Sequence, residues 1–186
     1  MREQQESEYN LYMIGKFDIP SALSQLMERS PAGFAVALHI RYQSPALLFQ
    51  TYPVAWLEEY SRDGLLMHDP TVAWALAERG VVRWDDLAGR DPAGVLGRAR
   101  GHGLVHGFTI SLKREGSLSI AGFARADRPF EATEIAGIGA LVGRLHDATA
   151  PGAPLAPETR EALRRLSVAF TQPGLRKTPG PATGPC

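Results

Sequence analysis

Three aromatic residues that carry polar side-chain atoms recur at intervals of four: Tyr52, Trp56 and Tyr60. Residues four apart lie on the same face of a helix, and Pro53 is well suited to begin one. Tyrosine and tryptophan usually require a hydrogen-bond partner when they are buried. One helix face is therefore predicted to present three polar groups for which an apolar core has no use.

A carboxylate and a further indole follow this helix. Asp69 stands directly before Pro70, and Trp84 comes fourteen residues after the proline. A purely structural interpretation exists, because Asp is a good helix N-cap and Pro suits the first helical position. Aromatic residues at helical spacing also commonly pack a core. Four aromatic polar groups and one carboxylate exceed what a core requires, which leaves a ligand-binding site open beside the structural interpretation.

The spacing Trp56-x3-Tyr60-x8-Asp69-Pro70-x13-Trp84 resembles, without a gap, the pattern of LuxR-type autoinducer-binding domains of quorum-sensing regulators. The segment GLVHGFTISL at 103–112 resembles the family's entry into its central sheet. The segment LSI at 118–120 resembles the strand that often supplies a small hydroxyl to the pocket. The resemblance extends over roughly residues 10–148.

The resemblance implies an uncharged ligand, an N-acyl-homoserine lactone, and a role for each polar residue. Trp56 would donate its indole N–H to the lactone carbonyl, because indole can only donate. Asp69 would accept the amide N–H of the ligand in a charge-assisted hydrogen bond. Tyr52 and Ser119 would donate their hydroxyls to the acyl carbonyl.

The remaining site residues would shape the pocket. Tyr60 and Trp84 would form walls around the lactone ring and the start of the tail. Pro70 has a structural role, and Gly107 would allow a close backbone approach or an unusual backbone dihedral. The acyl tail needs an apolar slot, because each buried methylene contributes up to ~0.8 kcal/mol. Seven residues are expected to line that slot: Leu38, Ile40, Phe49, Val72, Leu76, Ile110 and Leu112.

The predicted fold is α/β (α+β): an α-β-α sandwich whose central, mainly antiparallel five-stranded sheet carries helices on both faces. Alternating apolar residues predict the strands, and Glu115-Gly116 predicts a hairpin between the last two. The expected strands are 33–41, 46–51, 81–84, 108–113 and 117–125. The expected helices are 18–27, 53–63, one from 69 that stops at 80, 91–102, 131–148 and 158–170.

Four segments are predicted along the chain. Residues 1–150 form the autoinducer-binding domain, and 151–156 form a Pro/Ala linker. Residues 157–170 resemble the first helix of the helix-turn-helix domain that follows in the family. Residues 171–186 contain four prolines and three glycines and are expected to be disordered. A complete DNA-binding domain is therefore not expected.

Composition and motifs argue against other protein classes. Lys+Arg and Asp+Glu both total 20, without the basic surplus typical of a nucleic-acid binder. No signal peptide or membrane-length apolar run is visible, and we expect a cytoplasmic protein without cofactor. The lone Cys186 cannot join a cysteine metal cluster. His102 and His106 are four apart, but Gly103 interrupts the helix, so neither a metal site nor an enzyme is predicted.

Several outputs remain open at this level. The domain is expected to dimerise, with itself or with a full-length LuxR-type regulator, and the second case would make it a dominant-negative inhibitor. It could instead sequester the signal, or derive from a decayed gene. The alternative functions are a ligand-responsive regulator that binds DNA directly and a sensor of another small molecule.

Overall fold

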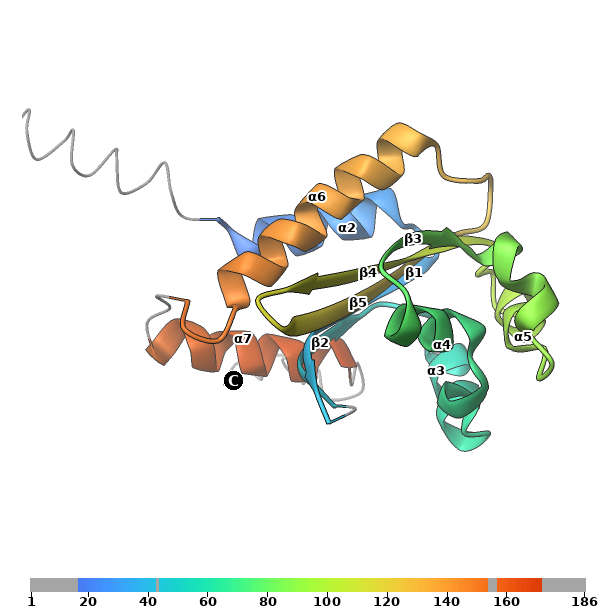
Figure 1. The fold of residues 1–186 in the computed structure, drawn as a ribbon, viewed down its shortest axis with the longest axis horizontal. Helices are drawn as coiled ribbons and strands as arrows, with labels where there is room; N and C mark the ends of the chain where they lie inside the picture. The colour runs from blue at the N-terminus through green and yellow to red at the C-terminus, as the bar shows by residue number, and fades with distance from the viewer. Residues whose placement is uncertain (1–16, 43, 154–156, 172–186) are drawn as a thin grey trace, which may run out of the picture.

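A computed structural model of the chain describes residues 17–42, 44–153 and 157–171. Its centre is one antiparallel sheet with the strand order β2-β1-β5-β4-β3 (Figure 1). The predicted five-stranded α/β architecture is therefore confirmed. The strands are β1 (Gly33–Arg41), β2 (Ser44–Gln50), β3 (Gly80–Arg83), β4 (His106–Arg114) and β5 (Ser117–Arg125).

Helices cover both faces of this sheet. Figure 1 shows α2 (Ile19–Arg29) and α6 (Ala132–Thr149) together on one face. The other face carries α3 (Val54–Arg62), α4 (Pro70–Ala77) and α5 (Val95–Gly101), with the 3₁₀ helices η1 (Leu65–His68) and η2 (Trp84–Arg90) between them. Helix α7 (Pro157–Thr171) lies beside β2. None of the helices in the described ranges is long and apolar enough to cross a membrane.

Local sequence explains where several of these elements begin. Asp18 caps α2 by accepting a hydrogen bond from the backbone N–H of Ser21, and Glu131 and Glu134 form a reciprocal capping box on α6. The predicted hairpin turn between β4 and β5 has positive φ angles at both Glu115 and Gly116. Two such residues are what a two-residue hairpin turn of matching twist requires.

Several predicted boundaries differ from the structure, and two of them have a clear local cause. The helix expected from Asp91 begins only at Val95, because both carboxylate oxygens of Asp91 accept backbone N–H groups of the first turn, at 2.8 Å each. Trp84 does not end a strand but begins η2. Asp is often a cap rather than a helical residue, and such caps shift boundaries that hydrophobic periodicity alone suggests.

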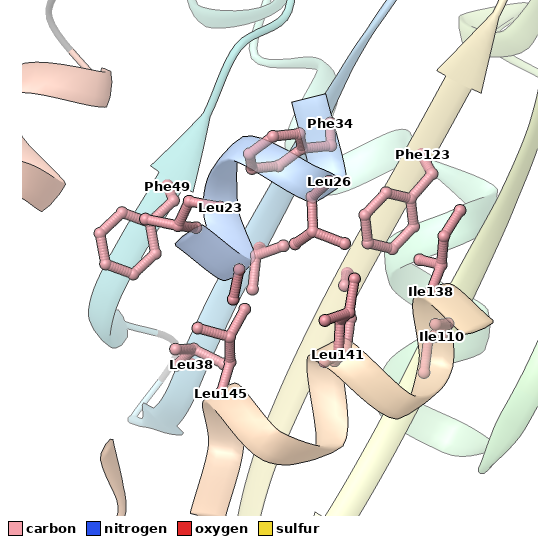
Figure 2. Close-up of a cluster of buried hydrophobic side chains, with 14 of the residues drawn as sticks. Leu23, Leu26, Phe34, Leu38, Phe49, Ile110, Phe123, Ile138, Leu141 and Leu145 are labelled. Carbon is pink, nitrogen blue, oxygen red and sulfur yellow. The ribbon is translucent and has the colours of Figure 1, made fainter. Parts of the chain in front are cut away.

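The largest core cluster fills the space between the sheet and the α2/α6 layer (Figure 2). Leu23 and Leu26 of α2 meet Ile138, Leu141 and Leu145 of α6 over the large side chains of the strands. The strands contribute Phe34, Val36, Leu38, Leu47, Phe49, Phe108, Ile110, Ala121 and Phe123. Most of the hydrophobic stabilisation therefore comes from this face.

Helix α7 packs against the edge strand β2. The hydroxyl of Ser167 donates to the carbonyl of Leu48 at 2.8 Å and accepts from its backbone N–H at 2.9 Å. Leu163 is buried in the main core, and Leu166 packs against it. A helix is thus present where the sequence predicts one, and its relation to a DNA-binding domain stays a prediction. Residues 172–186 lie outside the described ranges.

Two neighbouring residues of α2 provide a test of this core. Leu26 is fully buried, whereas Met27 is 45% exposed. We expect Leu26→Ala to lower the free energy of unfolding by about 2–5 kcal/mol, because it leaves a cavity under the α2/α6 layer. Met27→Ala should change it by less than about 1 kcal/mol. Urea denaturation measures both, and equal effects would contradict the placement of α2.

Candidate ligand-binding site

Three glycines allow aromatic rings to lie directly on the sheet. A Cβ atom at Gly107 would come within 2.3 Å of the Trp84 ring, and one at Gly33 within 2.9 Å of the Tyr52 ring. A Cβ at Gly122 would lie 2.9 Å from the Tyr52 hydroxyl. All three glycines therefore mark places where only a hydrogen atom fits. Gly107 permits the close approach expected of it, and its neighbour in that approach is Trp84.

Tyr60 and Asp69 are joined by a hydrogen bond. The Tyr60 hydroxyl donates to Oδ2 of Asp69 at 2.8 Å, while Oδ1 caps α4 by accepting the N–H of Thr71, also at 2.8 Å. Each carboxylate oxygen can accept a further hydrogen bond. Asp69 thus combines the structural cap that its position before Pro70 suggested with spare capacity to accept an N–H group.

Burial keeps the two tyrosines protonated. It raises the pKa of Tyr52 and of Tyr60 well above the ordinary value, and the neighbouring Asp69 charge raises both further. A phenol whose pKa is raised remains a hydroxyl, able to donate, throughout the physiological range.

Trp56 lies within the aromatic group and is only 4% exposed. Its ring meets the edge of Tyr60 at a centroid distance of 5.4 Å and contacts His102 at 5.5 Å. The His102 ring is in turn held by Glu59, whose carboxylate lies 2.7 Å from Nε2. That hydrogen bond is the main reason why the pKa of Glu59 is lowered.

Two donors of the cluster are unused. Within residues 17–42, 44–153 and 157–171, neither the indole N–H of Trp56 nor the hydroxyl of Tyr52 has a hydrogen-bond acceptor. By contrast, the indole N–H of Trp84 donates to the buried hydroxyl of Thr109 at 3.0 Å. Neither atom belongs to the fully buried polar atoms that lack a partner, which are Ser30 Oγ and Arg125 Nε in the described residues, so both donors remain accessible to a ligand.

Thr109 was not among the predicted ligand-binding residues. It accepts from Trp84, and its oxygen lies 3.9 Å from the Cβ position of Gly122, on the side where the Tyr52 hydroxyl lies. The sequence did contain a signal for Thr109. In β4, the polar residues Thr109 and Ser111 alternate with the apolar residues Phe108 and Ile110. Residues of alternate parity face opposite sides of a sheet.

Ser119 is placed on the opposite face and needs correction. Its hydroxyl accepts the backbone N–H of His39 at 3.1 Å and lies 2.8 Å from Nδ1 of His146. Both partners belong to the α6 side, because His146 is part of α6. The sheet therefore separates Ser119 from Tyr52, and the acyl-carbonyl role predicted for this serine does not fit its position.

The predicted tail-lining residues are also divided by the sheet. Leu38, Phe49 and Ile110 lie in the α2/α6 core, and Leu112 has the same strand parity as Ile110. The prediction that these four share a slot with Trp56 is wrong, because alternation shows which residues share a face but not which face binds. Three predicted residues lie elsewhere: Ile40 is half-buried opposite Leu118, Val72 is half-buried on α4, and Leu76 is 50% exposed.

Among the residues that the structure describes, no group of three His, Cys, Asp or Glu side chains could hold a metal ion.

An open hollow of about 490 Å³ lies at the edge of the aromatic cluster, where His102 contributes to its wall. Its other lining residues are Pro31, Ala32, Thr51, Pro53, Gly103, Ala126 and Asp127.

Comparison with known proteins assigns the family. Residues 32–149 match the family model described as an autoinducer binding domain. The chain belongs to this family. The LuxR-type resemblance deduced from Trp56, Tyr60, Asp69 and Trp84 is thereby confirmed, and all four residues lie within the matched range.

Curated relatives are transcriptional activators. The chain is 30% identical over 87 residues to the transcriptional activator protein VanR of Vibrio anguillarum, which covers 45% of this chain and 36% of VanR. It is 28% identical over 104 residues to SolR of Ralstonia nicotianae, which covers 55% of this chain and 44% of SolR. The matched segments thus span less than half the length of these relatives.

Solved structures of SdiA share the fold. Escherichia coli SdiA superposes with a TM-score of 0.55 and 20% identity, covering 94% of this chain and 82% of SdiA. SdiA in complex with octanoyl-rac-glycerol gives a TM-score of 0.54 and 19% identity, covering 92% and 79% of the two chains. At this level of identity, the likeness concerns the fold alone.

The fit of Trp84 on Gly107 can be tested by adding one methyl group. We expect Gly107→Ala to lower the free energy of unfolding by about 1–3 kcal/mol, because the new Cβ overlaps the indole ring. Gly97→Ala is the matched control, since no heavy atom lies within 4 Å of its Cβ position. Urea denaturation compares the two variants, and an unchanged stability of Gly107→Ala would contradict the close contact between Trp84 and Gly107.

The two buried histidines predict sensitivity to acid. Burial lowers the pKa of both His39 and His146, so the unfolded chain binds protons more readily than the folded protein. The free energy of unfolding should therefore fall as the pH drops below about 6.5. Charged neighbours that also act on the pair are Arg41, Arg114, Glu115 and Asp147.

This pH dependence can be assigned by substitution. His146→Gln removes one titrating group and retains a side chain that can bond to Ser119. Urea midpoints measured from about pH 7 to about pH 5 should fall less steeply for this variant than for the wild type. Identical slopes would show that the histidine pair does not cause the loss of stability.

Proposed function

We propose that this domain binds an N-acyl-homoserine lactone as the sensor of a LuxR-type quorum-sensing system. The observation that carries the proposal is the pair of free donors, Trp56 and Tyr52, beside a carboxylate with spare acceptor capacity, Asp69. A ligand that satisfies all three must offer acceptor oxygens to the two donors and an N–H group to the carboxylate. An N-acyl-homoserine lactone has this set of groups.

Each polar group of such a ligand has a complement. The indole of Trp56 suits the lactone carbonyl, and Asp69 suits the amide N–H. Tyr52 suits the acyl carbonyl, and Thr109 supplies the second hydroxyl that the sequence had assigned to Ser119. The hydroxyl oxygen of Thr109 already accepts the indole N–H of Trp84, so its hydroxyl hydrogen is available to donate to the ligand.

The wider role follows from the family. The relatives VanR and SolR are named transcriptional activators, which supports a receptor in transcription regulation and not an enzyme. We infer that ligand binding here controls such a regulator, through a homodimer or through pairing with a full-length family member. Co-purification with an intact family member would support the second arrangement.

Ligand binding can be tested by thermal shift and calorimetry. The wild type should be stabilised by butanoyl-, octanoyl- or dodecanoyl-homoserine lactone, because a ligand that binds only the folded state raises the melting temperature. Octanoyl-rac-glycerol is an informative comparison, since it has an acyl carbonyl but no amide N–H. Preference for it over every lactone would contradict the proposed ligand class.

Two substitutions test the assigned contacts. Trp56→Phe and Asp69→Asn should each weaken lactone binding about 10-fold or more, because a lost hydrogen bond in a buried site costs about 1–3 kcal/mol. Asp86→Asn is a matched control for the carboxylate, since Asp86 is exposed in η2 and lies outside the aromatic cluster. Calorimetry gives the dissociation constants, and equal losses in test and control variants would contradict the roles of Trp56 and Asp69.

A further inference from the structure

The indole of Trp56 contacts two other rings, and a carboxylate holds each of them. Tyr60 meets the indole edge-on at a centroid distance of 5.4 Å, and the Tyr60 hydroxyl donates to Asp69. His102 contacts the indole at 5.5 Å, and its Nε2 donates to Oε2 of Glu59 at 2.7 Å. The surroundings of the indole therefore depend on two carboxylates, of which the function proposed above uses only Asp69.

Helix α3, which carries Trp56, has little apolar packing. Of its nine residues, all of which the structure describes, only Trp56 is buried. Leu57 and Tyr60 are half-buried and pack against the same cluster. Helices in proteins are held mainly by the packing of an apolar face. Because α3 buries so little of one, its position depends more than usual on polar contacts with a neighbouring helix.

Helix α5 supplies these polar contacts. Arg98 reaches across one turn of α3, where its Nε donates to Oε1 of Glu59 at 2.6 Å and its Nη2 donates to Asp63. His102 is the C-cap of α5 and binds the other oxygen of Glu59. These hydrogen bonds lower the pKa of Glu59 and of Asp63, so both carboxylates are charged near neutral pH.

Helix α5 is itself anchored in the interior. Val95, Leu96 and Ala99 are buried in the smaller core cluster, to which Trp56 also belongs. Both carboxylate oxygens of Asp91 accept backbone N–H groups of its first turn. The contacts made by α5 therefore tie α3 to a part of the molecule that hydrophobic burial already fixes.

We propose that Glu59 is a positioning residue, whose bonds to Arg98 and His102 hold the Trp56 indole in the orientation that donates to the ligand. This inference rests on the proposed function. Glu59 acts on the indole through the backbone of α3, where Trp56 is three residues earlier, and through the His102 ring. Ion pairs that remain partly exposed contribute little to folding stability. Loss of Glu59 should therefore affect ligand binding more than unfolding.

The experiment measures the binding of octanoyl-homoserine lactone to the complete chain by calorimetry. Glu59→Ala should weaken binding about 5-fold, and its urea midpoint without ligand should shift by less than about 0.5 M. Glu58→Ala is the matched control on the same helix, because Glu58 is exposed and has no hydrogen bond or ion pair with the described residues. The control should change binding by less than about 2-fold.

A double-mutant cycle separates positioning from a general structural role. If Glu59 acts through the Trp56 N–H, Glu59→Ala should weaken binding by less than about 2-fold in the Trp56→Phe background. An equal loss in both backgrounds would overturn the positioning role.

Salt provides a second measurement, because the lactone is uncharged and salt screens ion pairs. Raising sodium chloride from about 0.05 M to about 1 M should reduce the ratio of the wild-type affinity to that of Glu59→Ala. A constant ratio would contradict the role of the ion pair.

Arg98→Met removes the same contact from the side of α5. It should weaken lactone binding in the same direction, and it decides the question if Glu59→Ala does not fold, as checked by circular dichroism. A wild type that binds no lactone overturns the proposed function itself. A wild type that binds the lactone, with Glu59→Ala and Arg98→Met binding equally well, overturns only the positioning role of Glu59.

Discussion

The two faces of one sheet carry side chains of very different size, and both the core and the candidate site depend on this difference. On the α2/α6 side, residues such as Phe34, Phe108 and Phe123 fill the space beneath the helices. On the other side, Gly107 and Gly122 bring aromatic rings against the backbone itself. The α2/α6 face thus holds the larger core, and the opposite face holds polar aromatics within a smaller buried cluster that includes Trp56 and Trp84.

Asp69 combines a structural role with the acceptor role that we propose for it. Asp69 caps α4, accepts from Tyr60 and retains lone pairs for a further donor. Trp84 is fixed by Thr109, while Trp56 keeps its N–H available next to Tyr60. Internal hydrogen bonds thus hold Tyr60, Asp69 and Trp84 in place, and a side chain that is already held loses less conformational entropy when a ligand binds.

Sequence patterns predicted much of this molecule because they depend on local physics. Alternation located the strands, and the spacing of Trp56, Tyr60 and Asp69 identified the family and its polar residues. What could not be predicted was the side of the sheet on which a strand residue lies. Alternation shows which residues of a strand share a face, but it does not show whether that face meets the α2/α6 layer or the aromatic cluster. Ser119 and Leu38 were assigned to the wrong face for this reason, and Thr109 was overlooked. A positive φ at His39 adds an irregularity in β1 that no periodic pattern contains.

The contact between Ser167 and Leu48 has a consequence for association. An edge strand with open N–H and carbonyl groups is a template for strand addition by another molecule. One hydroxyl of α7 satisfies both backbone groups of Leu48 and so occupies the outer margin of β2. Any neighbour that assembles with this domain by extending its sheet at β2 would first have to displace the helix, which directs assembly toward other surfaces.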